Sequence, residues 1–256
     1  MTVIYQPSGR AREYAEWACN LYRGCPHACA YCFAPDVLRR TGITRYEFHK
    51  GAVPRKDILK QLERDARNQP PRLVHLCFTC DPYPGELSEK YDHSLITRSA
   101  IEILKDHEYG VQILTKGGMD STCDFDLLGS GDEYATTLTF SRDADSALWE
   151  PHAALPSDRL DALVVAQRYG IEHWASLEPV IYPDQSLELL EAAICTGVSK
   201  VKVGPLNYKD KLPKWLSDTV PTDIDWRAFA EKVQSQCDAF GVECILKDDL
   251  KKLAGL

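Results

Sequence analysis

The segment "NLYRGCPHACAYCFAPD", residues 20–36, places three cysteines, Cys25, Cys29 and Cys32, at spacings of four and three. Structural zinc sites need four ligands, usually in paired motifs, and this loop supplies only three thiols. His27 lies inside the loop, where its ring cannot easily turn onto a metal held by both flanking cysteines. Three thiolates on one tight loop suit an iron–sulfur cubane, in which each thiolate holds a different iron and the fourth iron stays open.

The composition is that of a folded protein without a membrane segment. The chain has 256 residues, of which 44% are apolar and 27% charged, enough for one large domain. No apolar run approaches the ~20 residues that span a bilayer, and residues 1–17 lack the apolar core of a signal peptide. We therefore expect a cytoplasmic protein. Ten cysteines are too few for a disulfide scaffold, so the clustered ones are interpreted first as ligands.

Short apolar runs alternate with amphipathic segments along the chain, which predicts an α/β fold of repeated βαβ units with a parallel sheet. With about six units, a partial (β/α)6 TIM-like barrel is favoured over an open sheet, which remains the alternative. The predicted strands are residues 16–20, 73–79, 110–116, 134–140, 171–178 and 199–204, with 242–247 as a seventh or an edge strand. The predicted helices are 54–67, 94–107, 157–170, 185–197 and 223–241.

We expect a single domain with an N-terminal extension over residues 1–15, a barrel core over 16–210 and a C-terminal helix and strand extension over 211–256 packed on the barrel. In such barrels the chemistry belongs to the C-terminal ends of the strands. Polar residues follow the predicted strands there, namely Thr79, Asp81, Lys116, Ser141 and Glu178.

The cysteine loop after a first strand resembles the signature of the radical S-adenosylmethionine (SAM) superfamily. Residues 20–36, 79–117, 148–171, 177–184 and 201–208 look like successive blocks of its spore photoproduct lyase-like group. The resemblance implies a [4Fe–4S] cluster on the three cysteines of the loop, with SAM chelating the open iron. It also implies reductive cleavage of SAM to a 5′-deoxyadenosyl radical that takes hydrogen from a substrate, with electrons from a carrier such as flavodoxin or ferredoxin.

Individual SAM contacts follow from the same resemblance. Tyr31 would lie against the adenine, or alternatively only pack the loop. Thr79 and Asp81 stand where the group has a polar segment that meets the SAM amino group, which needs acceptors. Lys116, in "ILTK", matches a lysine that reaches the SAM carboxylate, the alternative being a solvated lysine at a strand end.

Two further contacts and a hydrogen donor are implied less directly. Either Thr139 or Ser141 would contact the ribose, and Glu178 would shape the adenine pocket. Lyases of this group return a hydrogen atom through a cysteine, for which Cys77 is a candidate because it shares a strand face with Thr79. A small buried hydrophobic role is the alternative for such a cysteine.

The substrate is predicted from the uneven charge of the chain, which is +5 over residues 1–60 and −13 over the remainder. Residues 39–56 carry six basic residues against one Glu and would contact phosphates, or else form a solvated face. We therefore expect a nucleic-acid pyrimidine, such as a thymine derivative in DNA, as the substrate for modification, rearrangement or repair. The alternatives are a peptide or small metabolite as substrate, and a non-catalytic Fe–S electron carrier or sensor. The candidate phosphate contacts are Arg39, Arg40, Arg45 and Lys50.

Overall fold

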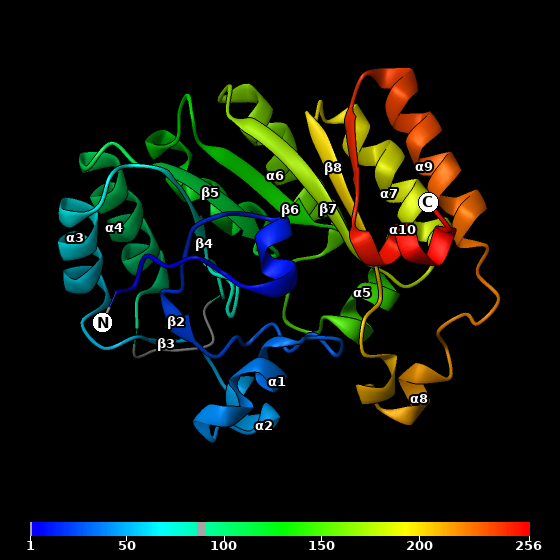
Figure 1. Ribbon diagram of the computed structural model, residues 1–256, viewed down its shortest axis with the longest axis horizontal. Coiled ribbons are helices and arrows are strands. Elements are labelled where there is room, and N and C mark those ends of the chain that lie inside the picture. The colour runs from blue at the N-terminus through cyan, green and yellow to red at the C-terminus, as the bar shows by residue number, and fades with distance from the viewer. Residues whose placement is uncertain (1, 86–90) are drawn as a thin grey trace.

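The computed structural model describes residues 2–85 and 91–256, except for the side chain of Arg40, and its centre is a seven-stranded parallel sheet (Figure 1). The strand order follows the chain order, whereas an open doubly wound sheet reverses its order partway across. The predicted α/β partial barrel is therefore confirmed, and residues 242–247 supply a seventh strand at one edge. The strands are β1 (Ala18–Cys19), β4 (Leu73–Leu76), β5 (Gly110–Thr115), β6 (Glu133–Thr137), β7 (Glu172–Val180), β8 (Lys200–Pro205) and β9 (Glu243–Leu246).

The five predicted helices are present, with one displaced start. The predicted helix 54–67 begins only at Ile58, because Val53–Pro54 forms β3 and pairs antiparallel with β2 (Tyr22–Arg23). The helices are α3 (Ile58–Asn68), α4 (His93–Asp106), α6 (Pro156–Arg168), α7 (Pro183–Cys195) and α9 (Trp226–Phe240). In the described part of the chain, no helix combines the length and apolarity needed to cross a membrane.

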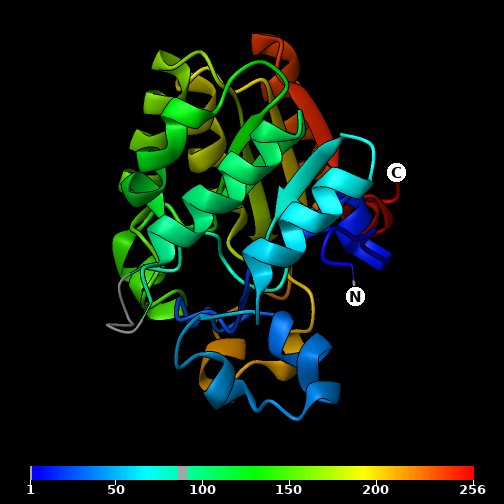
Figure 2. The same cartoon turned by 90° about the vertical axis from the view of Figure 1, so that its left-hand side faces the viewer.

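The two faces of the sheet are covered by different parts of the chain (Figures 1 and 2). Helices α4, α6 and α7 lie on one face, while the N-terminal segment with the 3-10 helix η1 (Gly9–Glu13) and helix α10 (Asp248–Ala254) lie on the other. On β8, Val201 and Val203 are buried, and the alternate residue Lys202 donates to the carbonyl oxygens of Glu13 and Tyr14 at 3.0 and 3.2 Å. Because successive side chains of a strand point to opposite faces, Lys202 points to the inner face of the sheet and binds the N-terminal segment there.

Several short elements lie beyond the C-terminal ends of the strands, below the sheet in both views. We call residues 33–50 and 208–217 the cysteine-side lobe; an ion pair of 3.3 Å between Lys211 and Asp36 joins its two segments. The lobe contains α1 (Ala34–Leu38), η2 (Arg39–Thr41), α2 (Arg45–Phe48), η4 (Lys209–Lys211) and α8 (Lys214–Ser217), while η3 (Gly118–Leu127) and α5 (Asp143–Trp149) follow β5 and β6.

Candidate functional site

The cysteine loop is held between the strand ends and the cysteine-side lobe. Gly24 opens it at φ +85°, and a Cβ there would lie 2.2 Å from the carbonyl oxygen of Gly51, so only glycine fits. The amide of Cys25 donates to the carbonyl oxygen of Phe48 at 2.9 Å, and the amide of Ala30 donates to that of Trp149 at 2.8 Å. Both ends of the loop are therefore fixed by backbone hydrogen bonds to neighbouring helices.

The three loop thiols are free and interact with one another electrostatically. Burial raises the pKa of Cys25 most, and the negative charges of Asp81, Cys29 and Cys32 raise it further. No three His, Cys, Asp or Glu side chains among residues 2–85 and 91–256 are arranged to hold one metal ion. A cubane spreads its thiolates over different irons, so the donor set fits a cluster although it does not fit a mononuclear site.

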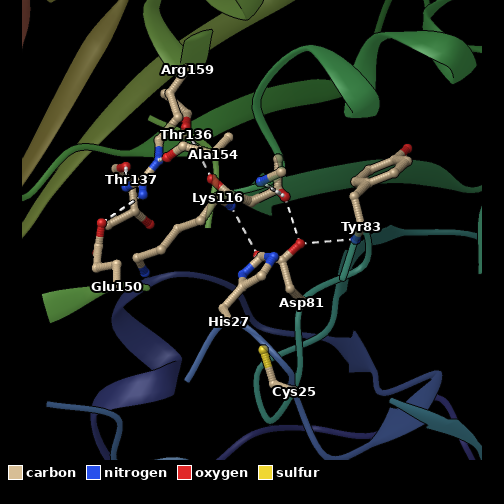
Figure 3. A network of polar contacts seen from close by, with 12 residues as sticks. Cys25, His27, Asp81, Tyr83, Lys116, Thr136, Thr137, Glu150, Ala154 and Arg159 are labelled. Atoms are coloured by element: carbon tan, nitrogen blue, oxygen red, sulfur yellow. Dashed lines mark hydrogen bonds and ion pairs between the residues drawn. The ribbon is translucent and has the colours of Figure 1, made fainter. Parts of the chain in front are cut away.

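Asp81 ties the end of β4 to the end of β5 and to the loop (Figure 3). One carboxylate oxygen accepts hydrogen bonds from the Thr115 hydroxyl at 2.5 Å and the Tyr83 amide at 2.9 Å, and the other accepts from the Lys116 amide at 2.9 Å. His27 lies 3.5 Å from the second oxygen, and burial lowers the pKa of this histidine. A carboxylate has about four lone-pair sites, so Asp81 retains capacity for one more donor.

Thr79 carries a buried polar atom without a partner among the described residues. Its hydroxyl oxygen has no hydrogen bond, while its backbone amide donates to Asn20 at 2.9 Å. Burying an unpaired hydroxyl costs about 1–3 kcal/mol. Such an atom at a strand end, two residues before Asp81, suits a polar ligand that binds there.

Glu150 and Arg159 form a buried ion pair, which lies to the left of Asp81 in Figure 3. Glu150 accepts from Arg159 at 2.6 Å and from the Tyr31 hydroxyl, and both charged side chains are at most 1% exposed. Burial would raise the pKa of Glu150, but Arg159 and Lys116 outweigh it and the pKa is lowered. The carboxylate therefore stays charged.

Lys116 is held as a cation between this pair and the cysteine loop. Its ammonium lies 5.6 Å from the centre of the Tyr31 ring. Burial alone would lower the pKa of Lys116, but the neighbouring Cys29 and Glu150 outweigh it, so the pKa is raised. Sequence reasoning missed Glu150 and Arg159, although both stand in the block 148–171 that resembles the family.

The other predicted contacts lie at different places around the strand ends. The Thr139 hydroxyl is 3.1 Å from that of Tyr31, so these two residues share one cluster. Ser141 instead donates to Glu188 on α7 at 2.5 Å. Glu178, on β7, accepts hydrogen bonds from Lys247, directly after β9, at 2.8 Å and from Tyr14, so it lies apart from the Tyr31 cluster.

Cys77 lies in the core directly after β4 in a left-handed conformation, φ +75°. The predicted strand 73–79 ends at Leu76, so the expectation that Cys77 shares a strand face with Thr79 is wrong. Its sulfur accepts from the Leu21 amide at 3.4 Å, so the thiol faces the start of the chain segment that leads into the cysteine loop. Its role as a hydrogen donor stays a prediction.

The predicted phosphate contacts belong to the cysteine-side lobe. Arg45 donates to the carbonyl oxygen of Cys32 at 3.0 Å and to Asp36 at 3.2 Å, so it supports the loop. Arg39 and Lys50 are exposed, and Lys50 lies 4.5 Å from the centre of the Tyr46 ring. The side chain of Arg40 lies outside the described part. Phosphate binding by these residues stays a prediction.

Comparison with known proteins found structural relatives only; no family model and no curated protein matches the chain. Spore photoproduct lyase complexed with dinucleoside spore photoproduct matches at TM-score 0.64 and 16% identity, over 94% of this chain and 78% of that one. SuiB from Streptococcus suis, bound to precursor peptide SuiA, matches at TM-score 0.63 and 12% identity, over 93% of this chain and 50% of that one. SuiB bound to S-adenosylmethionine matches at TM-score 0.61 and 11% identity, over 92% and 51%.

The chain thus spans about half the length of SuiB. At these identities the likeness is one of fold, and both neighbours are radical SAM enzymes. The fold, the three-thiol loop and the polar strand ends agree with one another: the chain has the partial-barrel fold of radical SAM enzymes.

Proposed function

We propose that the protein is a radical SAM enzyme whose cysteine loop holds a [4Fe–4S] cluster and whose strand ends hold SAM against it. The observation that carries this proposal is the position of Lys116, a partly buried cation that lies 5.6 Å from the centre of the Tyr31 ring and interacts with Cys29 and Glu150. Bound there, the cluster would supply one electron that cleaves SAM to methionine and a 5′-deoxyadenosyl radical, which takes hydrogen from the substrate.

The residues of the chain bind and orient SAM on this proposal. Lys116 pairs with the SAM carboxylate, because an ammonium kept charged in a partly buried place favours an anion. The Thr79 hydroxyl and the free lone pair of Asp81 accept from the SAM amino group. Their buried positions also exclude water, which protects a carbon radical from unwanted hydrogen donors.

Tyr31 is oriented by its hydroxyl, which contacts Thr139 and donates to Glu150. On our proposal its ring lies against the adenine while Thr139 reaches toward the ribose. Ser141, which follows β6, is the alternative ribose contact, and Glu178 on β7 shapes the adenine pocket.

We propose a nucleic-acid pyrimidine as the substrate, with modification, rearrangement or repair of a thymine derivative as the reaction. The support is the spore photoproduct lyase structure with its dinucleoside ligand, of which the match covers 78%, against 50% of SuiB. A peptide is the second candidate, supported by the SuiB structure with a bound precursor peptide.

The experiment is an anaerobic incubation of dithionite-reduced protein with SAM and an oligonucleotide deuterated at thymine. We expect 5′-deoxyadenosine to form and to carry deuterium. Unlabelled deoxyadenosine would exclude the thymine hydrogens, and no cleavage at all would contradict radical SAM chemistry. A nucleic-acid substrate also predicts affinity that falls steeply with salt, about one log unit per log salt per phosphate contact, which a peptide substrate does not.

A separate hydrogen donor is required if the product radical is quenched by a hydrogen atom that does not return directly from 5′-deoxyadenosine. If Cys77 fills that role, Cys77→Ala should still cleave SAM but fail to release the repaired or modified product. A variant that forms product at the normal rate would exclude Cys77.

A further inference from the structure

The cysteine-side lobe carries positive charge on an otherwise acidic chain. Its two segments, residues 33–50 and 208–217, contain seven Lys or Arg against three Asp or Glu, in a chain whose net charge is −8. One of the three acids, Asp36, is already paired with both Arg45 and Lys211. Arg39, Lys50 and Lys214 are exposed cations, of which Lys214 also pairs with Asp218 at 2.9 Å.

The same lobe exposes large aromatic side chains. Tyr46 is 73% exposed, Trp215 59% and Tyr208 49%. Aromatic residues together with arginine are enriched in protein–protein interfaces, where they bury large areas at low entropic cost. Two of the rings lie against lysines, Tyr46 against Lys50 and Tyr208 against Lys211. Three exposed rings on one basic lobe give it the composition of a contact surface.

A hollow of about 340 Å³ is lined by residues of the cysteine loop and of the lobe together. Cys29 and Ala30 line it from the loop, and Arg45, His49 and Lys211 line it from the lobe. Thr79, Asp81 and Lys116, the strand-end groups, do not line it. Cys29 therefore stands between two environments, with the strand-end cations on one side and the basic hollow on the other.

We propose that the cysteine-side lobe is the docking surface for an acidic one-electron carrier protein, which delivers its electron through the hollow beside Cys29. The inference rests on the proposed function, because it needs a redox group on the cysteine loop. One electron leaves the reduced cofactor of the carrier and enters that group, and no bond forms or breaks between the two chains.

Two requirements favour a redox carrier over a nucleic acid at this surface. A substrate must reach the radical formed beside the strand-end groups, and those groups do not line the hollow, whose lining comes from the cysteine loop and the lobe. An electron donor must instead approach the thiolates closely, because electron transfer slows steeply with distance. Redox encounters also use small, electrostatically steered interfaces, which suits a lobe of this size.

The test compares two triple variants with the same change in net charge. The lobe variant is Arg39→Glu/Lys50→Glu/Lys214→Glu. The control is Lys60→Glu/Lys232→Glu/Lys252→Glu, whose exposed positions lie on α3, α9 and α10. The first readout is binding of a flavodoxin, as the acidic carrier, at low and high salt. The second is 5′-deoxyadenosine formation driven either by reduced flavodoxin or by dithionite, which needs no docking surface.

We expect the lobe variant to bind flavodoxin at low salt about tenfold more weakly than the control, because steering by charge is lost. Its flavodoxin-driven rate should fall in parallel, while the dithionite-driven rate stays that of the unaltered protein. Equal binding by the two variants would overturn the inference. It would also be overturned if the lobe variant lost binding of a single-stranded oligonucleotide but kept its flavodoxin-driven rate.

Failure of dithionite to drive SAM cleavage in the unaltered protein would contradict the proposed function rather than the docking surface. The binding measurement needs no turnover, so it decides the docking question in that case as well.

Discussion

The two sides of the cysteine loop use charge in opposite ways. On the strand-end side, Glu150 and Arg159 are at most 1% exposed and fully paired. On the lobe side, Lys214 and Asp218 form a pair with 86% and 58% of their side chains exposed. Buried charges need partners to be tolerated at all, whereas exposed ones are almost free of cost. The inner side thus holds its charges in fixed, paired positions, and the outer side leaves its charges in contact with solvent.

We expect the largest effect of any substitution from replacing a thiol of the cysteine loop. Cys29→Ser replaces a soft thiolate by a hydroxyl that holds iron poorly. We expect the anaerobically reconstituted protein to lose most of its about four irons per chain, and SAM cleavage to fall to background. Cys123→Ser, at an exposed cysteine on η3, should change neither. Normal SAM cleavage by Cys29→Ser would refute the ligand assignment.

The buried pair should dominate stability on the strand-end side. Glu150→Gln leaves Arg159 buried without a counter-charge and should lower the free energy of unfolding by about 3–5 kcal/mol. Asp218→Asn, at the exposed pair, should cost about 0.5 kcal/mol or less. Denaturant unfolding of both variants measures the contrast. Similar small losses in both would mean that the strand-end pair is more hydrated than the structure indicates.

Lys116→Met separates SAM binding from cluster binding. The variant keeps the apolar stem but removes the cation, so SAM affinity should fall about ten- to a hundredfold, the range of 1.5–3 kcal/mol for a charge-assisted bond. Iron content should stay unchanged. Anaerobic calorimetry and iron analysis on the same sample check this. Parallel loss of iron and SAM would show that the lysine supports the loop instead.

We expect the smallest effect from a substitution of Thr79. Its change in stability should have the opposite sign to that of a comparable substitution elsewhere. Thr79→Val removes a buried hydroxyl that has no partner, so the protein without SAM should gain about 1 kcal/mol of stability while SAM binding weakens about fivefold. The matched change Thr136→Val breaks a 3.0 Å bond to the Thr115 carbonyl oxygen and should destabilise the protein. If Thr79→Val is also destabilising, or leaves SAM binding intact, the hydroxyl is not a ligand.

The regular elements were predictable because their signals are local. The run 73–76 is apolar except for His75, as expected of a buried strand, and helix α3 buries Ile58, Leu62 and Ala66 at spacings of four. The start of α3 was placed too early because Val53–Pro54 pairs with a strand thirty residues upstream, and such a partner leaves no local trace. The short helices of the cysteine-side lobe were not predicted for the same reason.

The candidate site was predictable only where a motif carries it. The loop cysteines, Asp81 and Lys116 follow from spacing and from strand ends. Glu150 and Arg159 are nine positions apart across a turn, although their side chains form a hydrogen bond. From the sequence alone, this spacing suggests two separate charges in solvent. Lys247 meets Glu178 from the far end of the chain, a contact that arises because β7, β8 and β9 lie next to one another in the sheet.

Whether the cysteine loop holds a cluster that binds SAM is decided by electron paramagnetic resonance of the reduced, anaerobically prepared protein with and without SAM. We expect a [4Fe–4S] signal whose shape changes when SAM is added, because one iron carries no protein thiolate and remains open to the ligand. A spectrum without a cluster signal, or one that SAM leaves unchanged, would contradict the proposed function.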